Sequence, residues 1–229
     1  MTTSDEPRQP TLAFDAALDY TRHGIAVLPV YWPITPDPRA PGAQRYPRGR
    51  ACSCGDPDCP TPAAHPIKPA TIADATTRVT VVTQWFQAHP YANIATVAGA
   101  TFDVIEVPYQ GPTAPLLDWL ATQPIPQPCP IIDSGHGLLH FPVSILPPAT
   151  SVPLTQGSAR RLAPGTLVLL PPSRHLDRAA VTWRRRFDER TSLLPDAARM
   201  LRVLAALPAH DPGAPGSGSG SGPARIGAQ

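Results

Sequence analysis

Three cysteines and one histidine stand close together in the first third of the chain. Cys52, Cys54, Cys59 and His65 follow the spacing C-x-C-x4-C-x5-H. Three thiolates and one imidazole complete a tetrahedral zinc shell, and a closed shell is structural because it leaves no position for water. Free surface or redox cysteines are the alternative, but this proline-rich stretch has no apolar pattern, and a bound metal would supply the folding energy it lacks. The spacing predicts a structural zinc site.

Two carboxylates interrupt the apolar run at residues 102–107. Asp103 and Glu106 flank Val104 and Ile105. Paired carboxylates on a strand commonly hold divalent ions for phosphoryl transfer. Positions three apart on a strand point to opposite faces unless a bulge intervenes. Two interpretations therefore stay open: a metal site, or carboxylates that face solvent or a loop.

Glycines surround a histidine in Ser134-Gly135-His136-Gly137. Glycine allows the backbone to approach a phosphate closely, so the hydroxyl of Ser134 and the imidazole of His136 are candidate phosphate contacts. The alternative is an ordinary turn, in which histidines beside glycines are common. Basic residues also gather around a later strand and could form a phosphate-binding face or a solvated charged edge. The candidates there are Arg160, Arg161, Ser173, Arg174 and Arg184.

The composition suits one domain with polar tails. The chain has 229 residues, of which 42% are hydrophobic, and 33 prolines, which favour short elements and stiff loops. No signal peptide or apolar run long enough to span a bilayer is evident, so we expect a cytoplasmic protein without membrane contact, in which cysteines bind metal more readily than they form disulfides. A net charge of +2 neither requires nor excludes nucleic acid.

Apolar periodicity predicts an α/β protein of the α+β type. The first helix carries Leu12, Ala16 and Tyr20 on one face, and Thr80 is a candidate N-cap for the second. We expect a disordered segment at 1–10, one domain at 11–208 with an insert at about 45–70, and a disordered tail at 209–229. Helices are expected at 12–20, 80–88, 116–122 and 192–207, and strands at 25–30, 93–98, 102–107, 138–143, 166–170 and 181–183.

Taken in order, these segments resemble the N-terminal domain of the bifunctional DNA primase/polymerase (prim-pol) family, in the archaeo-eukaryotic primase superfamily, and in particular a branch with a cysteine insert. The resemblance covers roughly residues 12–190, and it depends on the order of motifs that are individually weak. The matching segments are the opening helix and strand (16–29), the stretch after the insert (65–77), Trp85 with Pro90, Ala92-Asn93-Ile94 and Gly99, the acidic strand (102–107), the Ser134-Gly135 turn, the V-x-x-P-P-S strand (168–173) and the closing strand (181–183).

The resemblance implies a mixed central sheet flanked by helices and template-directed nucleotidyl transfer in DNA replication. It implies Mg²⁺ or Mn²⁺ as the catalytic metal, and single-stranded or template DNA and nucleoside triphosphates as partners. Asp103, Glu106 and His136 would lie at the catalytic site.

The sequence departs from the family pattern at positions where catalytic residues are expected. Pro108 stands two residues after Glu106, where the second metal carboxylate is expected, and Leu138 takes the place of the family's histidine. Arg160 and Arg161 occupy the region of the later acidic residue. We therefore expect nucleotidyl transfer to be weakened or lost. The alternatives are a non-catalytic DNA- or nucleotide-binding module and a regulatory protein that binds a protein partner.

Overall fold

The computed structural model describes residues 10–37, 39, 49–126, 129–146, 155–156, 158–187 and 194–207. The expected disordered ends and much of residues 38–48 lie outside these ranges. The helices are α1 (Pro10–Arg22), the 3₁₀ turn η3 (Ile72–Asp74), α2 (Val79–Ala88), α3 (Thr113–Ala121) and α4 (Ala197–Ala205). The strands are β1 (Leu28–Val30), β2 (Pro33–Ile34), β3 (Ala51–Cys52), β4 (Asn93–Val97), β5 (Asp103–Pro108), β6 (Ile131–Asp133), β7 (Leu138–Val143), β8 (Thr155–Gln156), β9 (Ala159–Arg161), β10 (Leu167–Leu170) and β11 (Thr182–Arg185).

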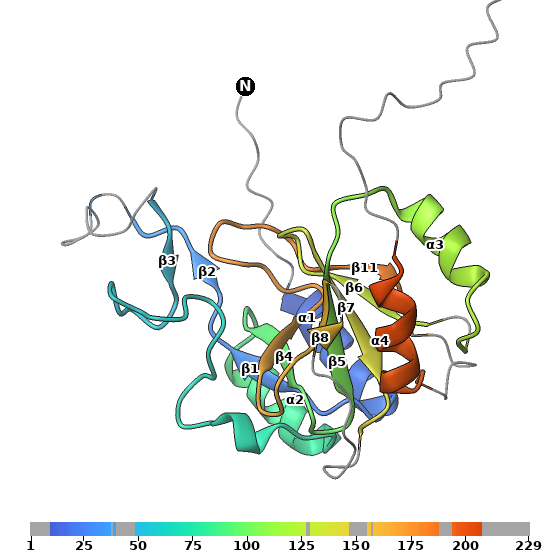
Figure 1. The fold of residues 1–229 in the computed structure, drawn as a ribbon. Helices are drawn as coiled ribbons and strands as arrows, with labels where there is room; N and C mark the ends of the chain where they lie inside the picture. The colour runs from blue at the N-terminus through green and yellow to red at the C-terminus, as the bar shows by residue number, and fades with distance from the viewer. Residues whose placement is uncertain are drawn as a thin grey trace, which may run out of the picture.

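Two sheets form the centre of the fold (Figure 1). The smaller has the strand order β1-β4-β10, and the larger has the order β11-β6-β7-β5-β9-β8. Strand β5 lies inside the larger sheet, where it pairs with β7 on one side and β9 on the other. Residues from three distant parts of the sequence therefore meet at β5.

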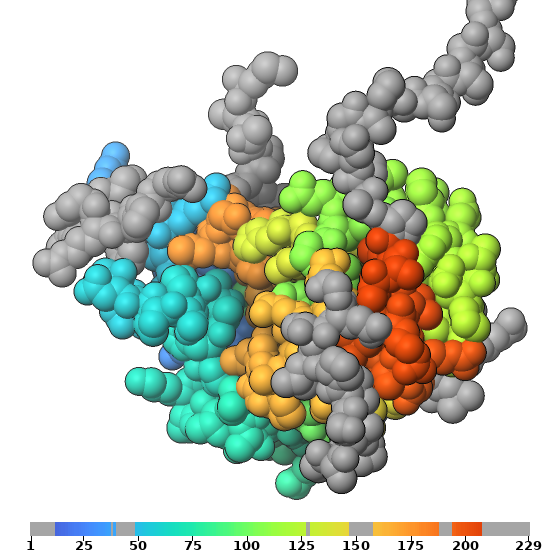
Figure 2. Space-filling model, viewed as in Figure 1, coloured from blue at the N-terminus to red at the C-terminus, as the bar shows by residue number. Residues whose placement is uncertain are grey.

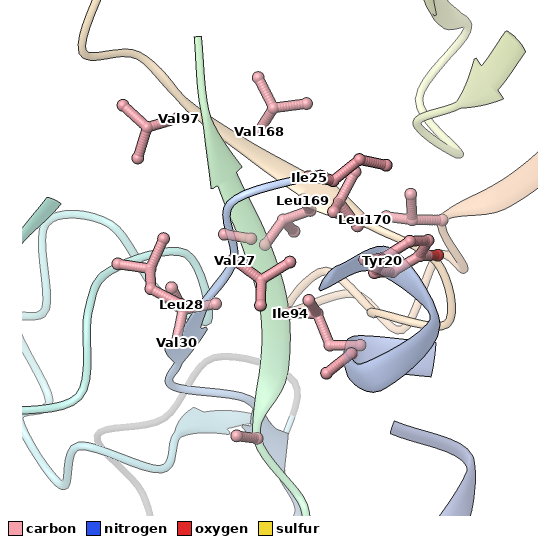
Figure 3. Close-up of a cluster of buried hydrophobic side chains, with 14 of the residues drawn as sticks. Tyr20, Ile25, Val27, Leu28, Val30, Ile94, Val97, Val168, Leu169 and Leu170 are labelled. Atoms are coloured by element: carbon pink, nitrogen blue, oxygen red, sulfur yellow. The ribbon is translucent and has the colours of Figure 1, made fainter. Parts of the chain in front are cut away.

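Two apolar clusters fill the layers on either side of the larger sheet. One cluster joins α1, α2 and the smaller sheet, and Figure 3 shows Tyr20 of α1 beside Ile94 and Leu170 of that sheet. The same cluster includes Val104 and Ile132 of the larger sheet. The other packs α3 and α4 against the opposite face, through residues such as Ile105 and Phe141. Because strand side chains alternate, neighbouring residues of β5 enter different clusters. Both faces of β5 are thus covered.

The cysteine segment forms a lobe on the side of the molecule away from α3 and α4 (Figure 2). Its hairpin of β2 and β3 pairs Pro33 with Cys52. The buried side chain of Asn93 ties the lobe to the sheet, because its amide donates to the carbonyls of Ala63 (3.0 Å) and Arg174 (2.8 Å). Each buried amide hydrogen thereby finds an acceptor.

The expected α+β class is confirmed, and the details differ in three places. The strand pairings of the described residues are all antiparallel and fall into separate sheets, in place of one mixed sheet. Helix α1 buries Tyr20 as expected, but Ala13 and Ala17 take the core positions expected for Leu12 and Ala16, and Leu12 is exposed. Arg78, and not Thr80, is the N-cap residue of α2.

Candidate functional site

Asp103 and Glu106 do not converge. No bulge interrupts β5 between them, since Asp103 pairs with Val143 and Glu106 with His140 in one continuous register with β7. Glu106 shares its face with Val104, toward the smaller sheet, and Asp103 shares the opposite face with Ile105. A single ion cannot bind both carboxylates across the sheet.

Asp103 is a buried structural group. Its side chain is 0% exposed, and Oδ2 accepts hydrogen bonds from the guanidinium of Arg161 (2.7 Å) and the backbone N–H of Leu146 (2.9 Å). The side chain of Arg161 is itself only 13% exposed. A fully buried charge requires such a partner, because an isolated charge is costly away from water. The pair joins β5 to β9 on the face covered by α4.

Glu106 lies in a group of three side chains on the other face, which we call the Glu106 group: Glu106, His140 and Arg160. His140 Nε2 lies 3.2 Å from Oε2, and the guanidinium of Arg160 donates to Oε1 from Nε at 2.7 Å and from its terminal nitrogen at 2.5 Å. The hydrogen bond with His140, and then that with Arg160, hold the pKa of Glu106 below its ordinary value despite partial burial. Glu106 is therefore a carboxylate whose charge a guanidinium already balances.

Pro108 and Leu138 face each other across β5 and β7, on the same sheet face as Glu106. At these two positions the resemblance described above led us to expect a second carboxylate and a histidine. Neither side chain can bind a metal ion or transfer a proton. The register thus brings the two apolar replacements together beside the Glu106 group.

A tight turn carries Ser134 and His136 at the edge of this site. The rings of His136 and His175 stack with centroids 4.0 Å apart, and His136 Nε2 lies 3.1 Å from a carboxylate oxygen of Asp177. His175 binds the carbonyl of Ser134 through Nε2 (2.8 Å), and burial, followed by the proximity of His136, lowers its pKa. The turn is therefore fixed to the loop after β10.

The arginines that were predicted to contact phosphate fall into two groups, one exposed and one largely buried beside carboxylates. Arg160 has a side chain that is 59% exposed, and Arg174 is also exposed. Arg161 is held by Asp103, and Arg184 by the carboxylate of Asp133 (2.9 Å) and the carbonyl of Gly111 (2.7 Å).

The two serines among the candidates are turned inward. Ser173 is 0% exposed, and its hydroxyl accepts from the backbone N–H of Ile94 (2.8 Å) and donates to the carbonyl of the same residue (2.9 Å). Ser134 is also buried, and its hydroxyl accepts from the N–H of His136 (3.3 Å). Ser173 is therefore a structural residue of the core and is not available to bind a phosphate, because both of its hydrogen bonds lie inside the fold.

The four residues of the cysteine motif converge. The ligand atoms of Cys52, Cys54, Cys59 and His65 all lie within 4.8 Å of one another. His65 Nε2 is 3.5 Å from the sulfur of Cys52 and 3.3 Å from that of Cys59, close to the edge of about 3.6 Å that zinc bond lengths give for a tetrahedron. The backbone N–H of Ala63 lies 3.3 Å from the sulfur of Cys52, as expected for a hydrogen bond that supports a thiolate ligand. The residues fit a metal ion.

Burial and the neighbouring Cys54 raise the pKa of the Cys59 thiol to about 12, and burial lowers the pKa of His65. A bound cation favours thiolates and the neutral imidazole. Within the described ranges, this cluster is the sole group of three or more histidine, cysteine or acidic side chains that could hold a metal ion.

The sequence model of the family described as bifunctional DNA primase/polymerase, N-terminal, matches residues 17–208. The chain belongs to this family. The match spans both sheets, the cysteine cluster and the Glu106 group, so the Prim-Pol domain includes every site described above. A comparison with curated proteins finds no match. No helix in the described part of this Prim-Pol domain is long and apolar enough to cross a membrane.

Two residues of the site had no signal in the sequence that pointed to their roles. His140 lies two residues after Leu138, which takes the place of the family's histidine, and His175 follows a proline-rich strand end. Their roles depend on pairings with residues 34 and 41 positions away, Glu106 and Ser134. The register of β5 and β7 brings His140 to Glu106, whereas the loop after β10 carries His175 to the turn at Ser134.

Proposed function

We propose that this Prim-Pol domain binds nucleic acid or nucleotides and has lost metal-dependent nucleotidyl transfer. One observation carries the proposal: Glu106, the carboxylate at the family's metal-binding position, is bound by Arg160 and His140. Two-metal transfer requires several carboxylates that converge on the ions. With Pro108 at the next ligand position and Asp103 on the opposite face, the site lacks that convergence. Losing such ligands costs many orders of magnitude in rate.

The same group supports binding of phosphate. A guanidinium carries five N–H donors, and the exposed side chain of Arg160 directs only some of them to Glu106. Charge-assisted hydrogen bonds from arginine are the common means of holding a phosphodiester. The exposed Arg174 follows β10 in the loop that also carries His175. Single-stranded DNA is the nucleic acid that the family suggests.

Primer synthesis and extension on single-stranded DNA with Mn²⁺ test the loss of catalysis. We expect the wild type to incorporate no more nucleotide than Glu106→Ala. Glu106 is the better target than the Asp103/Glu106 double variant, because removing Asp103 would leave Arg161 buried without its partner. Incorporation by the wild type that disappears in Glu106→Ala would overturn the proposal.

Fluorescence anisotropy with a labelled single-stranded oligonucleotide tests binding. Arg160→Ala should weaken binding and reduce the slope of log affinity against log salt by about one. Glu106→Gln should tighten binding slightly, because it removes a negative charge beside Arg160. Arg202→Ala is the matched control, since it removes an exposed positive charge from α4, behind the opposite sheet face. No binding, or equal effects of Arg160→Ala and Arg202→Ala, would favour a protein partner and refute this part of the proposal.

We further propose that the cysteine cluster holds structural zinc. Cys52, Cys54, Cys59 and His65 would fill all four positions of the shell, so the ion would stabilise the lobe and take no part in chemistry. Mg²⁺ or Mn²⁺ would be needed only by an active site that catalyses transfer. The tie from Asn93 to Ala63 and Arg174 would transmit the order of the lobe to the loop beside the Glu106 group.

A further inference from the structure

A pocket of about 260 Å³ lies between α2 and the segment that follows the cysteine cluster. Its apolar wall is made by Pro29, Ile67 and Pro69. Trp85 contributes from α2 and His89 from the C-terminal end of that helix, and Lys68 and Asp74 contribute from the segment opposite. None of these residues belongs to the Glu106 group or to the cysteine cluster of Cys52, Cys54, Cys59 and His65, so the pocket is a separate feature of the surface.

Both walls of the pocket are held in place. The backbone N–H of Ile67 donates to the carbonyl of Pro29 (3.2 Å), which fixes the 67–70 segment along β1. Trp85 lies in α2 and His89 is the C-cap residue of that helix, and the N–H of His89 donates to the carbonyl of Trp85 (2.9 Å). Trp85 also packs against the core, so its ring is fixed. The pocket is therefore preformed.

The polar groups at the pocket have bonding capacity to spare. In the described part of the chain, the ammonium of Lys68, the imidazole of His89 and the indole N–H of Trp85 have no hydrogen-bond or ion-pair partner. Asp74 accepts through Oδ2 from the N–H (2.7 Å) and hydroxyl (2.9 Å) of Thr71. These bonds lower the pKa of Asp74, so it is ionised, and its second oxygen can accept a further hydrogen.

A suitable ligand must combine three properties. It must offer a flat apolar body to Trp85 and the proline wall, an anionic group to Lys68 and His89, and an N–H donor to Asp74. A nucleotide has all three, since its base stacks on aromatic rings, its phosphate binds cations, and its base carries N–H groups. The volume of about 260 Å³ is below the usual range for drug-sized ligands, so the pocket has room for at most one nucleotide.

We propose that this pocket binds one nucleotide, with the base against Trp85, the phosphate at Lys68 and His89, and a base N–H on Asp74. The choice of a nucleotide over other flat anions rests on the proposed function of the domain. The nucleotide is either free or an unpaired residue of a nucleic-acid strand, because both present the same base and phosphate. The pocket would give the domain a second contact with its ligand, apart from Arg160.

Nuclear magnetic resonance of the intact chain tests this assignment, because each of the 4 tryptophans gives one indole N–H signal. Trp85→Phe identifies the signal of Trp85 by its absence. Adenosine monophosphate should shift that signal, and Lys68→Glu should weaken the titrated affinity at least tenfold. Lys68 is exposed, so this change leaves the fold intact. Adenosine, which lacks the phosphate, should bind wild type and Lys68→Glu with equal, weaker affinity.

A signal of Trp85 that adenosine monophosphate does not move, or an affinity that Lys68→Glu does not change, would overturn the assignment. Arg160→Ala separates the two proposals, because it should weaken oligonucleotide binding and leave the Trp85 titration unchanged. A short single-stranded oligonucleotide that shifts the Trp85 signal assigns the pocket to a nucleotide within a strand. A shift with adenosine monophosphate alone assigns it to the free nucleotide, and both results support the proposal.

Discussion

Arg160 lies directly opposite Glu106 across β5 and β9, and both its Nε and a terminal nitrogen donate to the same carboxylate oxygen, Oε1. A guanidinium therefore takes up the charge that a carboxylate at this position would offer to a metal ion. His140 completes the group from the other neighbouring strand. Glu106 is therefore a member of an ion pair and not a free metal ligand. The contribution of this pair to the free energy of unfolding should depend on pH.

The stability contributed by Glu106 should disappear in acid. Its pKa in the folded protein is lowered from 4.5, so the unfolded chain takes up the proton first as the pH falls. The contribution is complete above about pH 4.5 and is lost as the pH falls through the lower, folded pKa. The gap in free energy of unfolding between wild type and Glu106→Gln should therefore shrink between pH 4.5 and more acidic conditions. Urea unfolding of both proteins at matched pH measures it, and a constant gap would contradict the expectation.

Asp103 should matter for stability and not for metal binding. Asp103→Ala removes the partner of Arg161, whose Nε already lacks a hydrogen bond in the described structure, and should cost about 3 kcal/mol or more in the free energy of unfolding. Replacing both residues, as in Asp103→Leu with Arg161→Met, should recover much of that loss. Urea unfolding of the three proteins measures the difference. A double variant no more stable than Asp103→Ala would argue against the ion pair as the cause.

Metal analysis of the purified protein should find about one zinc per chain. Cys54→Ser should lower this content and destabilise the lobe, because metal binding and folding of such a segment are coupled. Cys129→Ala is the matched control, since Cys129 is a buried cysteine outside the cluster and its loss should leave the zinc content unchanged. A well-folded protein without zinc would refute the site.

Gly135 should tolerate no side chain. Its φ is +80°, and a Cβ atom would come within 2.5 Å of the carbonyl oxygen of Ala180. Gly135→Ala should therefore destabilise the protein by about 2 kcal/mol or more, since backbone strain adds to a steric clash. Gly24→Ala separates these causes, because Gly24 has a similar φ of +73° with open space around it. Thermal unfolding should show a larger loss for Gly135→Ala, and equal losses would exclude the clash.

Several properties follow from residues that are close in the sequence. The spacing of Cys52, Cys54, Cys59 and His65 predicted a metal cluster because a short segment can bring its own side chains together, and their convergence confirms that geometry. The order of motifs predicted the family that the match at residues 17–208 confirms. The alternation of strand side chains indicated that Asp103 and Glu106 could point to opposite faces of the sheet. The uninterrupted register of β5 with β7 shows that they do.

The tertiary structure alone decided which groups face one another. The sequence marked Arg160 and Arg161 as equivalent phosphate contacts, yet adjacent positions of β9 point to opposite faces, so one meets Glu106 and the other is buried with Asp103. The encounter of Pro108 with Leu138 likewise follows from the register of β5 and β7. Register depends on the packing of whole strands and on the turns between them, and a shift by one residue would exchange these partners, so no local pattern contains the answer.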